Sequence, residues 1–250
     1  LMAHLRDNIA LPKWMAPAPL IAVPTTSGTG SEVTRWGTLW GDDEVKHSIK
    51  DNKLYPTQAV LDPTLTASMP TELTLSTALD SLSHALEAIW NKRHTTVSDE
   101  LAQRAVALIK RNLVPTLHRP DDVELRRRLQ TASLLAGLAM GTTQTAIAHS
   151  ISYPFTAKLG LPHGIACSFT LAEVARHNMQ VDSGRLVLAA DAFGCTLDGF
   201  PHALENWLAE LGVGAILERF VTADIIDKLS GSLMTRARAA NNIRETDVGA

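Results

Sequence analysis

The sequence lacks the features that would place this protein in an oxidising compartment, in a membrane or on nucleic acid. Its 250 residues include two cysteines, too few for a disulfide framework, so a reducing, cytoplasmic location is expected. No apolar run reaches the length of a membrane span, and the first residues do not form a secretory signal. The net charge is -3 without any basic cluster, so neither nucleic acid nor a membrane surface is an expected partner.

Hydrophobic residues make up 45% of the chain, enough for one large core or two smaller ones. The first residues, Leu1 to Arg6, read like the middle of a helix that has no cap, and the last four residues also end abruptly. We therefore expect that residues are missing at both ends of the chain.

Strands and loops are expected over the first 70 residues. The candidate strands span residues 19–24, 36–40 and 58–61. Residues 25–31 follow the first of them as a loop that is rich in hydroxyl groups and glycine. Three prolines, at positions 56, 63 and 70, interrupt the stretch that follows.

From Thr71 onward, the spacing of apolar residues predicts a mostly helical chain. The clearest case is the stretch of residues 72–90. Ser98 is the expected N-cap of a second helix that Pro115 disturbs, and Asp121 with Glu124 resembles the capping box of a third. The expected helices after the first span residues 98–113, 121–140, a stretch that ends at Tyr153-Pro154, 163–177, 201–211 and 223–239.

Two residues on the first predicted helix could share one metal ion. Asp80 and His84 are four positions apart, so their side chains lie on the same face of a helix. On spacing alone, a surface ion pair is the more common meaning of such a pair. The leucines around them argue for burial, however, and a buried carboxylate needs a partner such as a metal ion.

Two further histidines complete a candidate ligand set. His149 lies among small and apolar residues, where a histidine is more often an ordinary core residue, and His163 lies in a turn, where exposure is usual. Together with Asp80 and His84 they form a set of three histidines and one carboxylate. Such a set suits Fe(II), Zn(II) or a neighbouring metal. Separation along the sequence does not show whether the four residues meet in space.

Four motifs, taken in order, resemble those of the iron-containing (group III) alcohol dehydrogenases. Residues 24–34, PTTSGTGSEVT, are similar to the PTTxGTGSEVT signature of that family, and residues 61–63, LDP, to its DP element. Residues 78–87, ALDSLSHALE, resemble its GMDALxHAxE motif. Residues 148–149 and 161–164, AH and LPHG, resemble its second block of metal ligands. The resemblance covers nearly the whole chain.

The resemblance implies a two-domain fold of dehydroquinate synthase-like architecture. Residues 1–70 would be the C-terminal part of a Rossmann-like α/β nucleotide-binding domain, and residues 71–250 an all-α metal-binding catalytic domain. The implied protein is a metal-dependent, NAD(P)-linked alcohol dehydrogenase or aldehyde reductase that acts on a small molecule and forms a homodimer or a higher homo-oligomer. Residues 80–92 and 149–154 resemble the corresponding sequences of one branch of the family, whose members reduce phosphonoacetaldehyde to 2-hydroxyethylphosphonate.

The resemblance also implies roles for individual residues. The metal ligands would be Asp80, His84, His149 and His163. The contacts to NAD or NADP would be Thr25, Thr26, Thr29, Thr34 and Lys46, with Gly28 and Gly30 permitting close approach to the cofactor. Tyr153 stands where many members of the family carry a histidine that relays a proton, so its hydroxyl is the candidate catalytic group.

The sequence leaves several alternatives open. The GGGS phosphate-binding loop of the family is absent from this chain, and Ala78 replaces a common glycine. A metal-dependent lyase similar to dehydroquinate synthase would share the architecture, and a non-catalytic truncated relative would keep the helical part. Lys92 and Arg35 flank the motifs and are candidates for binding an anionic substrate, although solvated surface charge is their ordinary role. The choices between Fe and Zn and between NAD and NADP also stay open.

Overall fold

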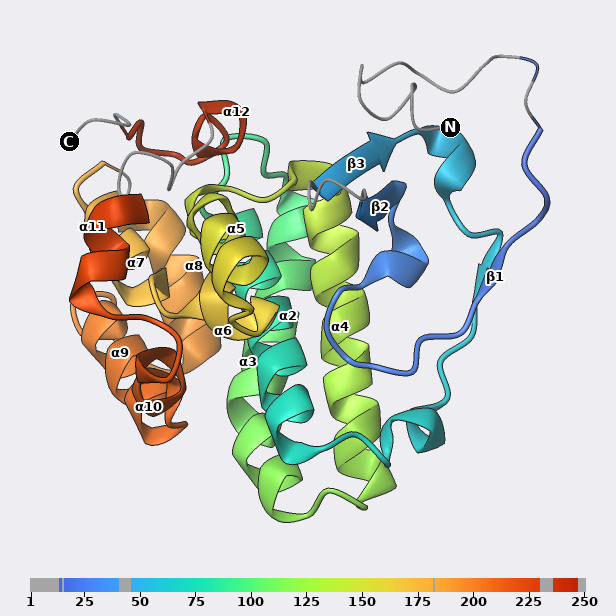
Figure 1. Cartoon of the computed structure of the whole chain (residues 1–250), viewed down its shortest axis with the longest axis horizontal. Coiled ribbons are helices and arrows are strands. Elements are labelled where there is room, and N and C mark those ends of the chain that lie inside the picture. Colours follow the sequence, from blue (N-terminus) through green and yellow to red (C-terminus); the bar gives the residue numbers. More distant parts are fainter. Residues whose placement is uncertain (1–13, 15, 41–45, 182, 230–235, 247–250) are drawn as a thin grey trace.

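The computed structural model describes residues 14, 16–40, 46–181, 183–229 and 236–246. Within these ranges the β-strands precede Thr71 and the α-helices follow it. Figure 1 shows the strands on one side of α4 (Val123–Thr143), and the shorter C-terminal helices on the far side of α2 (Thr71–Ile89) and α3 (Thr96–His118). The secondary structure therefore changes where the sequence predicts a domain boundary, and the division into two domains stays a prediction.

The strands form two small sheets. β1 (Ile21–Ala22) pairs in parallel with β4 (Gln58–Ala59), as expected for part of an α/β domain. β2 (Trp36–Trp40) pairs with β3 (Lys46–Lys50) in an antiparallel manner, and β3 had no counterpart among the predicted strands. The connections include the 3-10 helices η1 (Ser31–Val33), η2 (Asn52–Leu54) and η3 (Pro63–Thr66).

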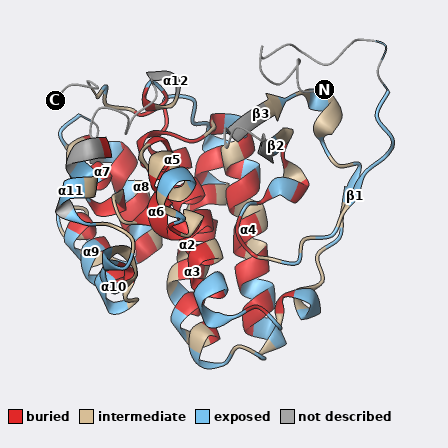
Figure 2. Cartoon of the chain, viewed as in Figure 1, coloured by how far each residue is buried: buried red, intermediate tan, exposed pale blue. Residues whose placement is uncertain are grey.

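Helix α2 lies at the centre of the helical part. Its side chains Leu79, Leu82, Leu86 and Ile89 are fully buried, as their spacing predicts. The other faces of α2 are buried too, because α3, α4 and α6 (His163–Ser168) pack around it (Figure 2). Several of its buried hydroxyls bond to backbone carbonyls; for example, the Ser83 hydroxyl donates to the Leu79 carbonyl at 2.8 Å. This helix therefore carries its polar side chains into the interior.

The predicted N-caps of α3 and α4 are wrong by a few residues. Thr95 caps α3: its hydroxyl accepts the Ser98 N–H at 3.1 Å, and the Ser98 hydroxyl accepts the Thr95 N–H at 2.8 Å. Ser98 is therefore the N3 residue of this capping box and not the cap. Asp122, rather than Asp121, caps α4 by accepting two backbone N–H groups at 3.1 Å.

Pro115 and Pro154 lie inside helices, so the helix ends predicted near them are wrong. α3 continues through Pro115 to His118, and α5 (Ile147–Leu159) continues through Pro154. A proline in a helix interior removes one hydrogen bond and costs about 3 kcal/mol, so the packing of these helices outweighs that cost. As a result, His149 and Tyr153 lie one turn apart on a single helix.

The remaining helices pack partly on α2, α3 and α5 and partly on one another. They are α7 (Leu171–Met179), α8 (Ser183–Phe193), α9 (Phe200–Glu210), α10 (Val213–Glu218), α11 (Ala223–Leu229) and α12 (Arg236–Ala239). The stretch predicted as one helix over 163–177 is thus divided between α6 and α7. Arg185 of α8 bonds to Asp99 of α3 at 2.7 and 2.8 Å and to the Ile89 carbonyl at the end of α2. Among the described residues, no helix is long and apolar enough to cross a membrane.

Gly164 allows α6 to approach α2 very closely. A Cβ atom at this position would lie 1.7 Å from the Ser76 carbonyl oxygen, far inside any nonbonded contact. We expect Gly164→Ala to lower the free energy of unfolding by about 3 kcal/mol, the upper end of the usual cost of overpacking, since two backbones must separate. Urea unfolding measures this change.

Gly214→Ala is the matched control for this substitution. A Cβ atom at position 214 would meet open space within α10, and alanine is the better helix former, so the stability should stay level or rise slightly. A similar loss in both variants, or none in Gly164→Ala, would contradict the close contact between α6 and α2.

Candidate metal centre

Three helices bring together the four residues predicted as metal ligands. α2 carries Asp80 and His84, α5 carries His149, and α6 begins with His163. The Nε2 atoms of His84, His149 and His163 lie 3.7, 3.4 and 3.9 Å from Asp80 Oδ1. We call these four residues the histidine cluster. Its three histidines, from three different helices, face one carboxylate oxygen.

The atoms at the centre of the histidine cluster lack hydrogen-bond partners within the described part of the chain. Asp80 Oδ1 and His149 Nε2 are both buried and unpaired. Leaving a buried polar atom unpaired costs about 1–3 kcal/mol, and more for a charged group. Three imidazole nitrogens within 3.9 Å of one carboxylate oxygen are donors that suit a divalent cation, which would supply the missing partner. His84 lies outside the tightest group of possible ligand atoms, which consists of Asp80, His149, His163 and Cys167.

The histidine cluster is buried on most sides and open on one. The Asp80, His84 and His149 side chains are at most 7% exposed, whereas the His163 side chain is 32% exposed. A small molecule could therefore reach the cluster from the side of His163, while protein covers its other sides. Such limited access restricts water at the site.

Glu87 fixes the orientation of His149. Its Oε2 lies 2.6 Å from His149 Nδ1, and the carboxylate also accepts the backbone N–H groups of Ala146, Ala148 and His149 at 2.9, 2.6 and 3.3 Å. A carboxylate at Nδ1 holds a proton there and directs Nε2 toward Asp80. The sequence prediction assigned no role to Glu87. Its position three residues after His84 on α2 already indicated that it lies on the same side of the helix as the ligands.

Burial and neighbouring charges shift the pKa values within the histidine cluster. Burial lowers the pKa of His84 to about 4. Burial would raise the pKa of Asp80, but the attraction of the surrounding histidines outweighs it and holds this pKa well below its usual range. At neutral pH, His84 is therefore neutral and Asp80 ionised, which are the states that metal ligands need. The pKa of His149 is raised despite its burial because Cys167 and Glu87 favour its charged form, so a cation at Nε2 would take the place of a proton.

Cys167 is a further donor beside the histidine cluster that the motif analysis missed. Its sulfur lies 3.6 Å from His163 Nε2, and ligand atoms of Cys167, Asp80, His149 and His163 all lie within 4.8 Å of one another. Burial would raise the pKa of the thiol, but His149 and His163 lower it to about 7. The family motifs give Cys167 no role. Cys167 nevertheless follows His163 by four positions, one helical turn, so both side chains lie on the same face of α6.

Tyr153, the predicted catalytic group, lies against the histidine cluster. Its ring stacks on that of His163 with centroids 6.1 Å apart and planes 18° apart. Burial raises the pKa of Tyr153, so its hydroxyl stays protonated at neutral pH. The geometry places an O–H group next to the cluster, and its part in proton transfer stays a prediction.

The comparison with known protein families covers almost the whole chain. Residues 74–248, which include the histidine cluster, match the C-terminal part of the Fe-containing alcohol dehydrogenase family. The chain belongs to the iron-containing alcohol dehydrogenase family. Residues 2–63 also match the family description "Iron-containing alcohol dehydrogenase".

Individual relatives within the iron-containing alcohol dehydrogenases are similar at about one third identity. The chain is 36% identical to the 1-propanol dehydrogenase of Salmonella typhimurium, over 76% of this chain and 51% of that protein. It is 35% identical to the phosphonoacetaldehyde reductase of Streptomyces viridochromogenes, over 91% of this chain and 60% of that protein. The chain therefore spans between half and two thirds of the length of these relatives.

The fold is also that of solved iron-containing alcohol dehydrogenases. The structure of sulfoacetaldehyde reductase from Bifidobacterium kashiwanohense in complex with NAD+ is similar with a TM-score of 0.87 and 31% identity, over 99% of this chain and 66% of that chain. An iron-containing alcohol dehydrogenase from Thermotoga maritima is similar with a TM-score of 0.80 and 32% identity, over 98% of this chain and 64% of that chain.

The loop that carries the predicted cofactor contacts lies beside α2 and α4. Thr25 and Thr29 are exposed and Thr26 is partly exposed, so their hydroxyls are accessible to a ligand. Thr34 is buried, and its hydroxyl donates to a backbone carbonyl of η1 at 3.4 Å. Lys46 begins β3, and its side chain lies outside the described part of the structure. The cofactor roles of all five residues stay predictions.

Gly28 and Gly30 allow this loop to pack closely against α2 and α4. The sequence did not indicate this reason for glycine at the two positions. A Cβ atom at position 28 would lie 2.7 Å from Thr77 Cβ on α2. Gly30 has a φ of +60°, and a Cβ atom there would lie 2.5 Å from Gly137 Cα on α4. The Ser81 hydroxyl donates to the Gly28 carbonyl at 2.9 Å. Gly28 thus attaches the loop to α2, the helix that carries Asp80 and His84, and Gly30 attaches it to α4.

Lys92 and Arg35, the cations predicted to bind an anionic substrate, make their contacts away from the histidine cluster. Lys92 Nζ pairs with Glu245 at 3.2 Å near the surface, and Arg35 donates a hydrogen bond to the Asn52 side chain. Neither of these contacts includes a residue of the histidine cluster.

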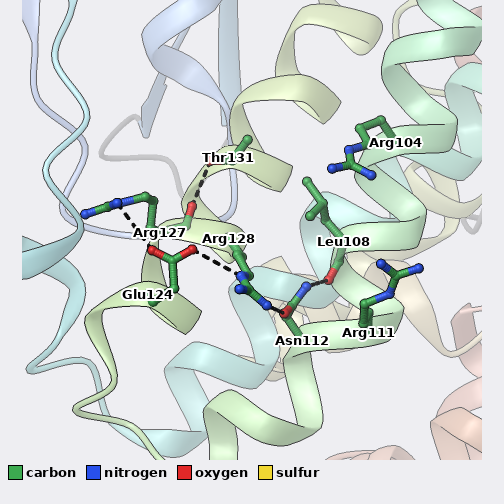
Figure 3. A pocket seen from close by; sticks show the side chains of 8 residues that line it. All are labelled: Arg104, Leu108, Arg111, Asn112, Glu124, Arg127, Arg128 and Thr131. Carbon is green, nitrogen blue, oxygen red and sulfur yellow. Dashed lines mark hydrogen bonds and ion pairs between the residues drawn. The ribbon is translucent and has the colours of Figure 1, made fainter.

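A cavity of about 440 Å³ lies between α3 and α4 (Figure 3). Its lining consists of Arg104, Leu108, Arg111, Asn112, Glu124, Arg127, Arg128 and Thr131. Glu124 pairs with Arg127 at 3.3 Å and with Arg128 at 3.2 Å, and all four arginines are exposed. None of the predicted site residues lines this cavity, which is a solvated polar groove separate from the histidine cluster.

Proposed function

We propose that the protein is a metal-dependent, NAD(P)-linked alcohol dehydrogenase that reduces aldehydes in the reverse direction. The observation that carries this proposal is the convergence of three histidine Nε2 atoms on Asp80 Oδ1, in a chain of the iron-containing alcohol dehydrogenase family. The relatives named 1-propanol dehydrogenase and phosphonoacetaldehyde reductase support the same class of reaction.

The proposed metal ligands are Asp80, His84, His149 and His163, for one Fe(II) or Zn(II) ion. A bound metal would supply Lewis-acid polarisation of the substrate oxygen, and bound NADH or NADPH would supply the hydride. Glu87 would hold His149 in the ligating orientation through the 2.6 Å contact at Nδ1. The buried walls of the cluster would keep water from the reacting atoms.

Other residues of the chain would hold the cofactor and a proton. The loop of Thr25 to Ser31 would offer hydroxyls and backbone N–H groups to NAD(P), and the NAD+ complex of a structural relative supports this class of cofactor. Tyr153 would hold a proton at its hydroxyl beside His163 and deliver it to the substrate oxygen. The nucleotide-binding domain would end near residue 70, and the helical domain would supply the metal ligands.

The proposed substrate is an aldehyde with an anionic group on the neighbouring carbon, such as phosphonoacetaldehyde. Two relatives support this choice, since one is named phosphonoacetaldehyde reductase and another sulfoacetaldehyde reductase. Both of those names describe a two-carbon aldehyde with a charged oxyanion group. The relative named 1-propanol dehydrogenase supplies the uncharged alternative.

An anaerobic assay of the full-length protein tests the proposed function. The protein would be given Fe(II) or Zn(II), NADH or NADPH, and propanal, phosphonoacetaldehyde or sulfoacetaldehyde. We expect nicotinamide oxidation that requires both the metal and an aldehyde. Absence of oxidation with every combination would contradict the proposal. Metal-dependent turnover of a substrate without net nicotinamide oxidation would favour the lyase alternative instead.

A further inference from the structure

Arg238 of α12 lies beside the histidine cluster. Its guanidinium carbon is 4.6 Å from the centroid of the Tyr153 ring, and that ring stacks on His163. Arg238 and His163 therefore contact the same aromatic ring, so a permanent positive charge lies near the cluster. The sequence pointed to other cations because Arg238 lies far along the chain from every motif of the family.

Arg238 has no carboxylate partner within the described ranges, unlike several other arginines of this chain. Arg185 pairs with Asp99 at 2.7 Å, and Arg219 pairs with Glu72 at 3.3 Å. Arg238 is partly buried, and its Nη1 donates to the Thr145 hydroxyl at 2.8 Å while its plane lies near the Tyr153 ring. A partly buried cation is costly without an anion.

The chain after α12 holds Arg238 in place. Asn241 Nδ2 donates to the Thr145 carbonyl at 2.8 Å, so the segment is attached to the residues just before α5. The side chains of Asn242 and Asn178 exchange hydrogen bonds of 2.7 and 3.1 Å in a buried pair. These bonds position Arg238 before any ligand arrives, and preorganisation of this kind reduces the entropy lost on binding.

We propose that Arg238 binds the oxyanion group of the substrate and so determines the preference for anionic over neutral aldehydes. This inference rests on the proposed function. A guanidinium offers five N–H donors in a planar fork that matches the oxygens of a phosphonate or sulfonate, and the Thr145 contact uses only part of this set. The oxyanion of such a substrate is only a few bonds from its aldehyde oxygen. Both groups must therefore be bound within one small site, and Arg238 and His163 lie within reach of one another through their shared contact with the Tyr153 ring.

The test compares wild-type protein with Arg238→Gln and Arg238→Lys in full-length, metal-loaded form. The values of kcat and KM are measured for phosphonoacetaldehyde, sulfoacetaldehyde and propanal. For Arg238→Gln we expect kcat/KM to fall about 10- to 100-fold with both anionic aldehydes, mainly through KM, as for the loss of charge-assisted hydrogen bonds. With propanal it should change less than about threefold, and Arg238→Lys should recover part of the loss because it keeps the charge without the fork.

Arg111→Gln is the matched control, since it makes the same change at an exposed arginine of the α3/α4 cavity. It should leave all three substrates unaffected. An equal fall with propanal and the anionic aldehydes in Arg238→Gln would overturn the proposal, because it would show that Arg238 only positions Tyr153. Unchanged kinetics with the anionic aldehydes would overturn it as well.

Failure of this inference can be distinguished from failure of the proposed function. Wild-type protein that reduces propanal but not the anionic aldehydes is still an alcohol dehydrogenase, and only the role of Arg238 is then wrong. If no aldehyde is reduced, the proposed function fails, and calorimetric titration with phosphonoacetate still decides the role of Arg238. Binding by wild-type protein that weakens at least about tenfold in Arg238→Gln supports an oxyanion site. Equal binding, or none, overturns it.

Discussion

Asp80→Asn is expected to remove stoichiometric metal from the protein and to abolish its turnover of aldehydes. Three histidine Nε2 atoms lie within 3.9 Å of Asp80 Oδ1, so this carboxylate supplies the negative charge of the histidine cluster. The amide has nearly the same shape but no charge, and it is a poorer ligand for a divalent cation. Removing one partner of a buried charge pair costs about 3–5 kcal/mol, which is a loss of affinity of about 10²- to 10⁴-fold.

Metal analysis of the purified protein and a metal titration measure this loss in Asp80→Asn. Asp191→Asn is the matched control, because it makes the same substitution at an exposed position of α8 and should keep full metal content. An Asp80→Asn protein that binds one metal per chain with the wild-type Kd would show that the histidine cluster is not the metal site.

Glu87→Gln is expected to weaken metal binding by about 10- to 100-fold, the usual effect of losing the partner that orients a metal-binding histidine. The Glu87 carboxylate accepts three backbone N–H groups as well as the His149 ring N–H. A glutamine can accept with only one oxygen, so its NH2 group would face donors. His149 would then lose its fixed orientation toward Asp80. We also expect the metal-free variant to be less stable by about 2–3 kcal/mol, because buried donors lose an ionised acceptor.

The loss of stability in Glu87→Gln should depend on pH. Burial would raise the pKa of Glu87, but His149 and the backbone N–H groups outweigh this and lower it below its ordinary value of 4.5. A carboxyl group whose pKa is lower in the folded state stabilises the protein above its unfolded pKa. This stabilisation disappears as the pH falls through the folded value. The difference between wild-type and variant should therefore be full at pH 7 and shrink as the pH falls below 4.5.

Denaturant unfolding of the two metal-free proteins at several pH values measures that difference. Glu100→Gln, at an exposed position of α3, makes the same substitution without a buried network and should match wild-type protein throughout. A constant difference between wild-type and Glu87→Gln from pH 7 to the acid range would show that the charge of Glu87 is not the cause.

Local periodicity was enough to predict helix α2 and its burial. The apolar residues between Leu75 and Ile89 recur often enough to cover most of the helix, and this property depends only on the order of residues along one element. The same local geometry places Asp80 and His84 on one face. His149 and His163 could be assigned as ligands only from the resemblance to the family. The number of residues between two helices does not show how those helices pack.

The tertiary structure decided which neighbours surround these ligands. Glu87 on α2 contacts His149 on α5, and Cys167 on α6 contacts His163. Arg238, from near the end of the chain, contacts Tyr153. Such contacts depend on packing between elements distant in sequence, so no periodicity within one element predicts them.

The sequence by itself determined the class of most elements, although β3, α8 and α10 had no predicted counterpart, and with the family motifs it gave the four candidate ligands. Pro115 and Pro154 show where that reasoning stops, because the local preference of proline ends a helix and packing overrode it in both cases. Gly28 and Gly30 show the same limit: the composition of the loop predicted close approach, and only the fold decided that helices α2 and α4 are the surfaces approached. Local conformational energies are set by neighbouring residues in the chain, whereas the site depends on contacts that exist only after the helices have packed.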